Sequence, residues 1–252
     1  MSVAALHSHG KRKRPGRGAF PDLVVFDLDF TLWPFYVYEH ISGPFKRSGR
    51  KGVCFCTRRK YSAPSPPAKG LVELRLFPDV VNILDDLRSA GVCMAIASSS
   101  PSLPHAVSAL KGFGIFDYFS TRSSICVFRS DEGKRKHFEQ ILSLFPSTPR
   151  QNVIFFDDLQ SNIKQGHMFG FACTKVDPIQ GLTYKTFFSA LSMWRSQQQS
   201  SSFMTNFLKA PKAKRLETSK RNCEDVNTEK NFSQQNNQST RNERERASPR
   251  ST

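Results

Sequence analysis

No run of apolar residues in the 252-residue sequence approaches the roughly 18 that a membrane-spanning helix requires, so we expect no such helix and no membrane partner. Proline, not an apolar segment, follows the basic run Lys11–Arg14, so we expect no secretory signal, although this run resembles a nuclear import patch. The six cysteines are scattered, several of them in apolar strand-like runs, and we expect no disulfide framework in a chain this long without a secretory signal. These absences favour a reducing compartment, the cytoplasm or the nucleus.

Acidic residues are missing from two long stretches, and much of the net charge of +16 arises there. Residues 1–18 contain five basic side chains and residues 40–69 contain eight, with no acidic side chain in either. Residues 196–252 contain eleven basic and six acidic side chains, whereas the rest of the chain has 13 basic and 15 acidic ones. A DNA-binding fold would carry a basic face on its core, so this distribution argues against a specific nucleic-acid partner.

Apolar residues are also scarce, at 38% of the chain against the roughly 45–50% of compact domains. We therefore predict a disordered basic arm over residues 1–20, a folded domain over 21–195 and a disordered polar tail over 196–252. Residues 40–70 lack periodicity and are long for a loop. They are either a small cap or flap inserted after the first strand, or the product of unusual splicing or of an incorrect gene model.

What the chain does contain is an alternation of short apolar runs and amphipathic segments. This alternation predicts an α/β fold, a Rossmann-like parallel sheet with helices on both faces, in which chemistry gathers at the carboxyl ends of the strands. The expected strands are residues 23–26, 92–97, 125–128, 152–156 and 171–176. The expected helices are residues 77–91, 131–145, 159–170 and 181–194.

Acidic side chains follow two of these strands directly. Asp27 and Asp29 come after residues 23–26, and Asp157 and Asp158 come after residues 152–156. At one edge of a parallel sheet these carboxylates would repel one another and require a cation, and hard oxygen ligands favour Mg²⁺. The alternative is that they are ordinary loop or helix-capping aspartates.

Three further features could serve a phosphate. Ser98 and Ser99 follow the strand expected at residues 92–97, where a hydroxyl and free backbone N–H groups suit phosphate oxygens. Lys134 or Lys136, near the start of a helix, could neutralise the phosphate charge, although taken alone such lysines are usually solvated. Trp33 is close enough in sequence to the aspartates to contact a leaving group.

Four strings together resemble the haloacid dehalogenase-type phosphatases over about residues 22–195, and the first is especially specific. They are FDLDFTLWPF at 26–35, LRLFPDV at 74–80, GKRKHFEQI at 133–141 and IFFDDLQSNI at 154–163. The resemblance implies that Asp27 is the nucleophile and forms an aspartyl-phosphate. It implies that Asp29 is the general acid and then the general base.

The same resemblance implies ligand and substrate classes. Asp27, Asp29, Asp157 and Asp158 would form the Mg²⁺ site, and Ser98, Ser99, Lys134 and Trp33 would contact the substrate. Ser99 replaces the larger or charged residue that is usual in the family, and the alignment favours Lys134 over Lys136.

The implied activity is that of a monomeric, acid-type phosphatase acting on phosphotyrosine proteins or on small phosphosugars of the fructosamine type. The alternative is a catalytically weak phosphate- or nucleic-acid-associated binding protein on the same fold. A chain that had lost its activity would normally have lost one of the implied catalytic residues, and none is lost here.

Overall fold

The computed structural model describes residues 19–58, 71–119 and 124–209, and the following account concerns these residues. The predictions for residues 1–18 and for 210–252 lie outside them. Among the helices of the described part, none is both long and apolar enough to cross a membrane.

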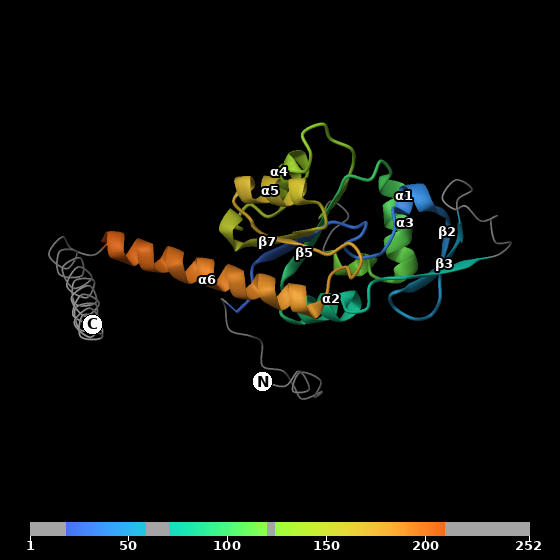
Figure 1. Cartoon of the computed structure of the whole chain (residues 1–252), viewed down its shortest axis with the longest axis horizontal. Coiled ribbons are helices and arrows are strands. Elements are labelled where there is room, and N and C mark those ends of the chain that lie inside the picture. Colours follow the sequence, from blue (N-terminus) through green and yellow to red (C-terminus); the bar gives the residue numbers. More distant parts are fainter. Residues whose placement is uncertain (1–18, 59–70, 120–123, 210–252) are drawn as a thin grey trace, which may run out of the picture. The chain divides into compact units, whose positions relative to one another are not determined.

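A five-stranded parallel sheet forms the centre of the fold, in the order β6-β5-β1-β7-β8 (Figure 1). All five strands predicted from the apolar runs are confirmed. β1 lies in the middle, where Leu23 pairs with Cys93 on one side and with Val153 on the other. The strands are β1 Leu23–Phe26, β5 Cys93–Ser98, β6 Ile125–Val127, β7 Val153–Asp157 and β8 Ala172–Lys175.

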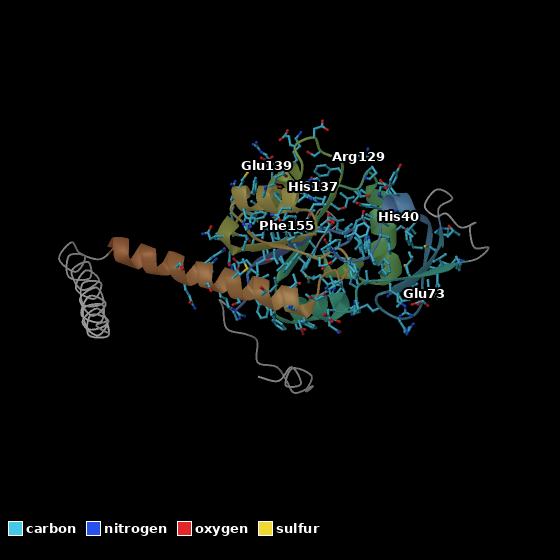
Figure 2. The ribbon with its side chains drawn as sticks, viewed as in Figure 1. His40, Glu73, Arg129, His137, Glu139 and Phe155 are labelled. Carbon is cyan, nitrogen blue, oxygen red and sulfur yellow. The ribbon has the colours of Figure 1, made fainter. Side chains whose placement is uncertain are left out.

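Helices cover both faces of this sheet, which explains why β1 is apolar at every position. Val24 and Phe26 pack into a core with α2, α3 and α6, whereas Leu23 and Val25 face α4 and α5 (Figure 1). On α4 the outward side is polar, and Glu139 is exposed while His137 is buried (Figure 2). These helices are α2 Val80–Ser89, α3 Leu103–Phe113, α4 Arg135–Leu144, α5 Gln160–Phe169 and α6 Tyr184–Lys209.

Two of these five helices differ clearly from the sequence-based expectation. α3 was not expected, because the serines and prolines before it resemble a turn. They instead start the helix, and the Ser102 side chain accepts a hydrogen bond from the His105 backbone N–H. α6 was expected to end near residue 194, but it continues to Lys209 and so includes the start of the segment predicted to be disordered.

The basic insertion folds as a second, antiparallel sheet. After the short helix α1 (Val37–His40), the strands β2 (Ile41–Arg47), β3 (Val53–Arg58) and β4 (Val72–Arg75) pair in the order β2-β3-β4. Its inner residues, Cys54 among them, join the core beside α3, so most of residues 41–58 form two strands joined by a turn. This sheet fits a small cap, and residues 59–70 of the insertion lie outside the described residues.

Candidate active site

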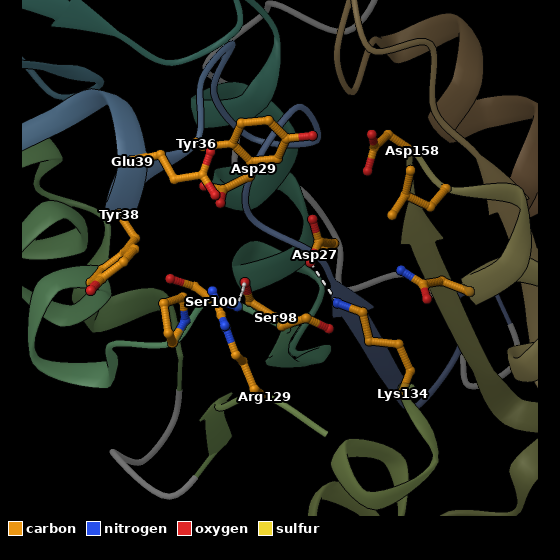
Figure 3. A pocket seen from close by; sticks show the side chains of 14 residues that line it. Asp27, Asp29, Tyr36, Tyr38, Glu39, Ser98, Ser100, Arg129, Lys134 and Asp158 are labelled. Carbon is orange, nitrogen blue, oxygen red and sulfur yellow. Dashed lines mark hydrogen bonds and ion pairs between the residues drawn. The ribbon is translucent and has the colours of Figure 1, made fainter. Parts of the chain in front are cut away.

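A pocket lies where β1, β5 and β7 end, and residues from distant parts of the chain line it (Figure 3). Its volume is about 220 Å³. Because β1 is flanked by β5 and β7, the residues at their carboxyl ends necessarily become neighbours. The lining consists of Asp27, Asp29, Tyr36, Tyr38, Glu39, Ser98, Ser99, Ser100, Pro101, Arg129, Lys134, Asp158, Leu159 and Asn162.

Asp27 and Lys134 form a buried ion pair at the base of this pocket. The Lys134 Nζ donates to Asp27 Oδ1 at 2.6 Å and to the Ala97 carbonyl at 2.5 Å, and it lies 3.5 Å from Asp157 Oδ2. Burial lowers the pKa of Lys134, but the charges of Asp27 and Asp157 more than offset this and leave it raised. Lys134 is therefore cationic and is held by two carboxylates.

The surroundings of Asp27 call for more positive charge than Lys134 supplies. Burial raises the pKa of Asp27 well above its usual value, Lys134 opposes this, and the charges of Asp157 and Asp29 raise it further. A second cation in the pocket would oppose these effects and keep Asp27 ionised. This is the state that a nucleophile or a metal ligand needs.

Asp29 lines the same pocket and directly precedes a sharp turn. Phe30 adopts the left-handed conformation, with φ of 57°, and its N–H donates to the Trp33 carbonyl at 2.7 Å. Asp29 Oδ1 accepts hydrogen bonds from Trp33 Nε1 at 2.7 Å and from the Val37 N–H at 3.1 Å. Burial raises the pKa of Asp29 to about 6, against the opposing effect of these two bonds. A carboxyl with this pKa can be protonated near neutral pH.

The prediction that Trp33 contacts a leaving group is corrected by its position. Trp33 has no exposed surface and stacks on Phe35 and Phe113. It does not line the pocket, because its ring fills the core while its N–H reaches Asp29. Trp33 therefore contacts Asp29 from the core and is not part of the pocket wall.

Asp157 and Asp158 diverge at the end of β7. Asp157 is fully buried, and its oxygens accept hydrogen bonds from the Leu159 N–H at 2.8 Å and from Asn162 Nδ2 at 2.9 and 3.0 Å. Asp158 lines the pocket, and burial, followed by the charge of Asp157, raises its pKa to about 6. Asn162, which was not predicted, holds Asp157 in place.

The donor chemistry of this edge suits a hard cation. In the residues that the structure describes, no three His, Cys, Asp or Glu side chains form a metal cluster by themselves. Asp27 and Asp157 nevertheless offer carboxylate oxygens on either side of one lysine. Magnesium typically binds proteins through one or two carboxylates and keeps several waters, so this sparse oxygen set fits Mg²⁺.

The predicted serines and lysines differ in their positions relative to the pocket. Ser98 is buried at the end of β5 and lines the pocket with the exposed Ser99. Lys134 enters the pocket, whereas the exposed Lys136 pairs with Glu132 at 3.0 Å on the surface of α4. The structure therefore brings only Lys134 to the site.

Several pocket residues were missed by the sequence analysis. Tyr36, Tyr38 and Glu39 belong to or flank α1, and Arg129 follows β6. Only the position of Arg129, just after a predicted strand, was a usable signal, because residues at that place reach the same edge of the sheet.

The chain matches known phosphatases. The family model described as Acid Phosphatase matches residues 19–197. Magnesium-dependent phosphatase 1 of Homo sapiens is 33% identical over 178 residues, which cover 71% of this chain and 89% of that protein. A HAD-like hydrolase superfamily protein of Schizosaccharomyces pombe is 31% identical over 148 residues, covering 57% and 78% of the two chains. The solved structure of a haloacid dehalogenase-like hydrolase from Streptococcus pneumoniae is 15% identical, with a TM-score of 0.41, and covers 70% of this chain and 91% of that one.

Proposed function

The chain belongs to the acid phosphatase family of haloacid dehalogenase-type phosphatases, and on this premise we propose that it hydrolyses phosphomonoesters through an aspartyl-phosphate on Asp27, with Mg²⁺ as cofactor. The observation that carries the proposal is the buried Asp27–Lys134 pair at 2.6 Å, with Asp29 beside it in one pocket. Nucleophilic attack on a phosphoester requires a carboxylate that is paired with a cation. It also requires a neighbouring carboxyl whose raised pKa lets it donate a proton.

The first step transfers the phosphoryl group to the enzyme. An Asp27 oxygen forms a bond to phosphorus while the bond from phosphorus to the ester oxygen breaks, and protonated Asp29 gives its proton to the departing alkoxide. Lys134 and the Ser98 hydroxyl hold phosphoryl oxygens whose charge would otherwise repel Asp27. Asp27, Asp157 and the Asp29 carbonyl would hold Mg²⁺, with Asp158 close by, and the ion would supply positive charge against the same repulsion.

The second step releases phosphate. Asp29, now ionised, takes a proton from a water molecule as that water attacks phosphorus. The bond between phosphorus and the Asp27 oxygen breaks, so the Asp27 carboxylate is restored and inorganic phosphate leaves. One carboxyl thus serves as acid and then as base, and Trp33 and the Val37 N–H hold it in place for both steps.

The size of the pocket supports small substrates or a single phosphorylated side chain. A volume of about 220 Å³ lies below the roughly 300–1,000 Å³ of drug-sized ligand sites. Tyr36 and Tyr38 could flank the ring of a phosphotyrosine, and Glu39 could bind hydroxyl or amine groups of a phosphosugar. We include both substrate classes in the proposal, with the protein acting as a monomer.

The proposed compartment is the cytoplasm or the nucleus. It is supported by the five cysteines of the described part, which carry free thiols. Burial raises the pKa of Cys54, Cys126 and Cys173 to about 12, so these thiols are unreactive.

The test is hydrolysis of a panel of phosphoesters with and without Mg²⁺, including a phosphotyrosine peptide and sugar phosphates. We expect turnover that requires Mg²⁺, and we expect Asp157→Asn to lose it while the variant stays folded by circular dichroism. Unchanged turnover in Asp157→Asn would remove the metal role of that residue. If the wild-type protein hydrolyses nothing on the panel with Mg²⁺ present, the phosphatase proposal fails.

A further inference from the structure

Arg129 occupies a defined place on the pocket rim. It follows β6, the strand that pairs with β5, so that Ser98 is the register partner of Val127. The Phe128 N–H donates to the Ser98 carbonyl at 3.2 Å, and His137 Nε2 lies 3.0 Å from both the Ser98 and the Phe128 carbonyl oxygens. The backbone just before Arg129 is thereby tied to the serine segment.

Strand order sets how far Arg129 lies from the reacting atoms. β6 is two strands away from β1, which delivers Asp27. Neighbouring strands are about 4.8 Å apart, so the ends of β6 and β1 are separated by about 10 Å. In Figure 3, Arg129 and Ser100 lie on one side of Ser98, and Lys134 and Asp27 lie on the other. Arg129 is thus part of the pocket but outside the position of the transferred phosphoryl group.

Arg129 forms no ion pair within the described residues, in contrast to Lys134. Lys134 is paired with Asp27 and Asp157, whereas no carboxylate of the described residues lies within ion-pair distance of Arg129. The pocket lining also contains four acids, namely Asp27, Asp29, Glu39 and Asp158. A guanidinium that lines this pocket without pairing with any of them is available to an anion on a ligand.

Ser100 supplies a second, independent observation. Its side chain lines the same pocket and is only 7% exposed, yet its hydroxyl has no hydrogen-bonding partner in the described structure. A buried polar group without a partner is unfavourable, and native proteins normally satisfy such groups with a neighbour, a water or a ligand. A ligand oxygen placed between Ser100 and Arg129 would satisfy both.

We propose that Ser100 and Arg129 form a second anion subsite, so that the preferred substrates are small phosphomonoesters with a carboxylate or a second phosphate at the far end. The inference rests on the proposed phosphatase function and specifies its substrate class. Planar guanidinium groups bind carboxylate and phosphate oxygens through paired hydrogen bonds, and both anions therefore suit the subsite. The pocket volume of about 220 Å³ favours a small molecule of this kind.

Three esters on one carbon chain test the subsite. Sorbitol 6-phosphate has a neutral far end, 6-phosphogluconate has a carboxylate there, and sorbitol 1,6-bisphosphate has a phosphate. We expect the wild-type kcat/KM to be at least about tenfold higher for either anionic ester than for the neutral one, the ratio that one charge-assisted hydrogen bond supplies. Arg129→Gln should bring this ratio close to one, and Ser100→Ala should lower it by a smaller factor.

Arg135→Gln is the matched control, because it removes the same charge from an exposed helix position outside the pocket lining. It should leave the ratio unchanged. An equal loss in Arg135→Gln and Arg129→Gln would mean that general surface charge causes the preference, and it would overturn the subsite. A wild-type ratio near one for both anionic esters would also overturn it.

A binding measurement separates this inference from the proposed function. Titration calorimetry on Asp27→Asn, with and without Arg129→Gln, compares the three esters without turnover. Preferential binding of the anionic esters that needs Arg129 supports the subsite even if the wild-type protein hydrolyses none of them, in which case only the phosphatase proposal fails. Turnover of all three esters, with no preference in rate or binding, contradicts the subsite and leaves the phosphatase proposal standing.

Discussion

The catalytic edge of the parallel sheet and the antiparallel β2–β4 sheet hold their charges in opposite ways. At the catalytic edge, the side chains of Lys134 and Asp157 are 1% and 0% exposed and lie 3.5 Å apart. On β4 the ion pair of Arg75 and Glu73 has side chains that are 60% and 37% exposed. Exposed pairs contribute about 0–1 kcal/mol to stability, whereas removing one partner of a buried pair costs about 3–5 kcal/mol.

This difference shows which charges carry information about function. The antiparallel sheet is strongly basic, with exposed Lys46 and Arg47 on β2, yet none of its strands lines the pocket. The base of the pocket instead holds two buried charges, Asp27 and Lys134, which the overall count of +16 conceals. Desolvation makes a charge expensive to bury, so a buried charge requires specific partners, whereas an exposed charge needs only water.

The largest effect should come from removing Asp27, and comparison with Asp29 assigns the two roles. We expect Asp27→Asn to lower kcat by about 10⁴-fold or more, as loss of a nucleophile does, with no covalent intermediate. Asp29→Asn keeps the nucleophile but loses the proton carrier, which contributes about 10²–10⁴-fold. With p-nitrophenyl phosphate, whose leaving group needs little protonation, it should give a rapid burst and slow release. Rapid-quench kinetics and mass spectrometry would locate the phosphoryl group, and finding it on Asp29 would reverse the assignment.

Lys134 and Lys136 allow a direct comparison of a buried and an exposed charge, because they lie two positions apart in the chain. Lys134→Met leaves Asp27 and Asp157 without their shared cation, so we expect a loss of about 3–5 kcal/mol in the free energy of unfolding. Its kcat should fall by about 10²–10³-fold, as when one donor to a transition state is lost. Lys136→Met breaks only the exposed pair with Glu132 and should cost about 0–1 kcal/mol. Urea unfolding and kcat of both variants provide the check, and similar values for the two would break the comparison.

A smaller effect is expected from pH. Burial raises the pKa of Asp29 to about 6, and the general acid acts in its protonated form. The rate with an alkyl phosphate should therefore fall by about tenfold per pH unit as pH rises above about 6. Ionisation of the phosphoester itself affects wild type and variants alike, so Asp29→Asn is the control and should lack this descending limb. A limb that persists in Asp29→Asn would assign it to another group.

The smallest effect should come from the antiparallel sheet. The double substitution of Lys46→Gln with Arg50→Gln removes two exposed positive charges that are not part of the pocket lining. We expect the free energy of unfolding to change by less than about 0.5 kcal/mol. We expect kcat/KM to stay the same for a phosphomonoester that has no second charged group. Any retention on heparin should weaken and become less sensitive to salt, because fewer cationic side chains contact the polyanion. A large loss of phosphatase activity would show that the basic sheet takes part in catalysis.

Much of the fold and of the reaction centre was determined by the sequence alone. The apolar runs predicted all five parallel strands, because burial on both faces leaves a continuous local signal. The acids directly after residues 23–26 and 152–156 could then be placed at one edge, since parallel strands deliver their carboxyl ends together. Asp27 and Asp29 could be identified because they stand two residues apart just after the first of these strands. The turn at Phe30 comes directly after them.

Other features were decided only by the tertiary structure. The choice between Lys134 and Lys136 depends on which side of the α4 start faces Asp27, a residue 107 positions away in the chain. Trp33 acts through Asp29 because α3, an unexpected helix, supplies the Phe113 ring on which it stacks. Arg129 enters the pocket because β6 pairs with β5. Periodicity records whether a residue is buried, but its partners depend on how distant segments pack, and packing leaves no local pattern in the sequence.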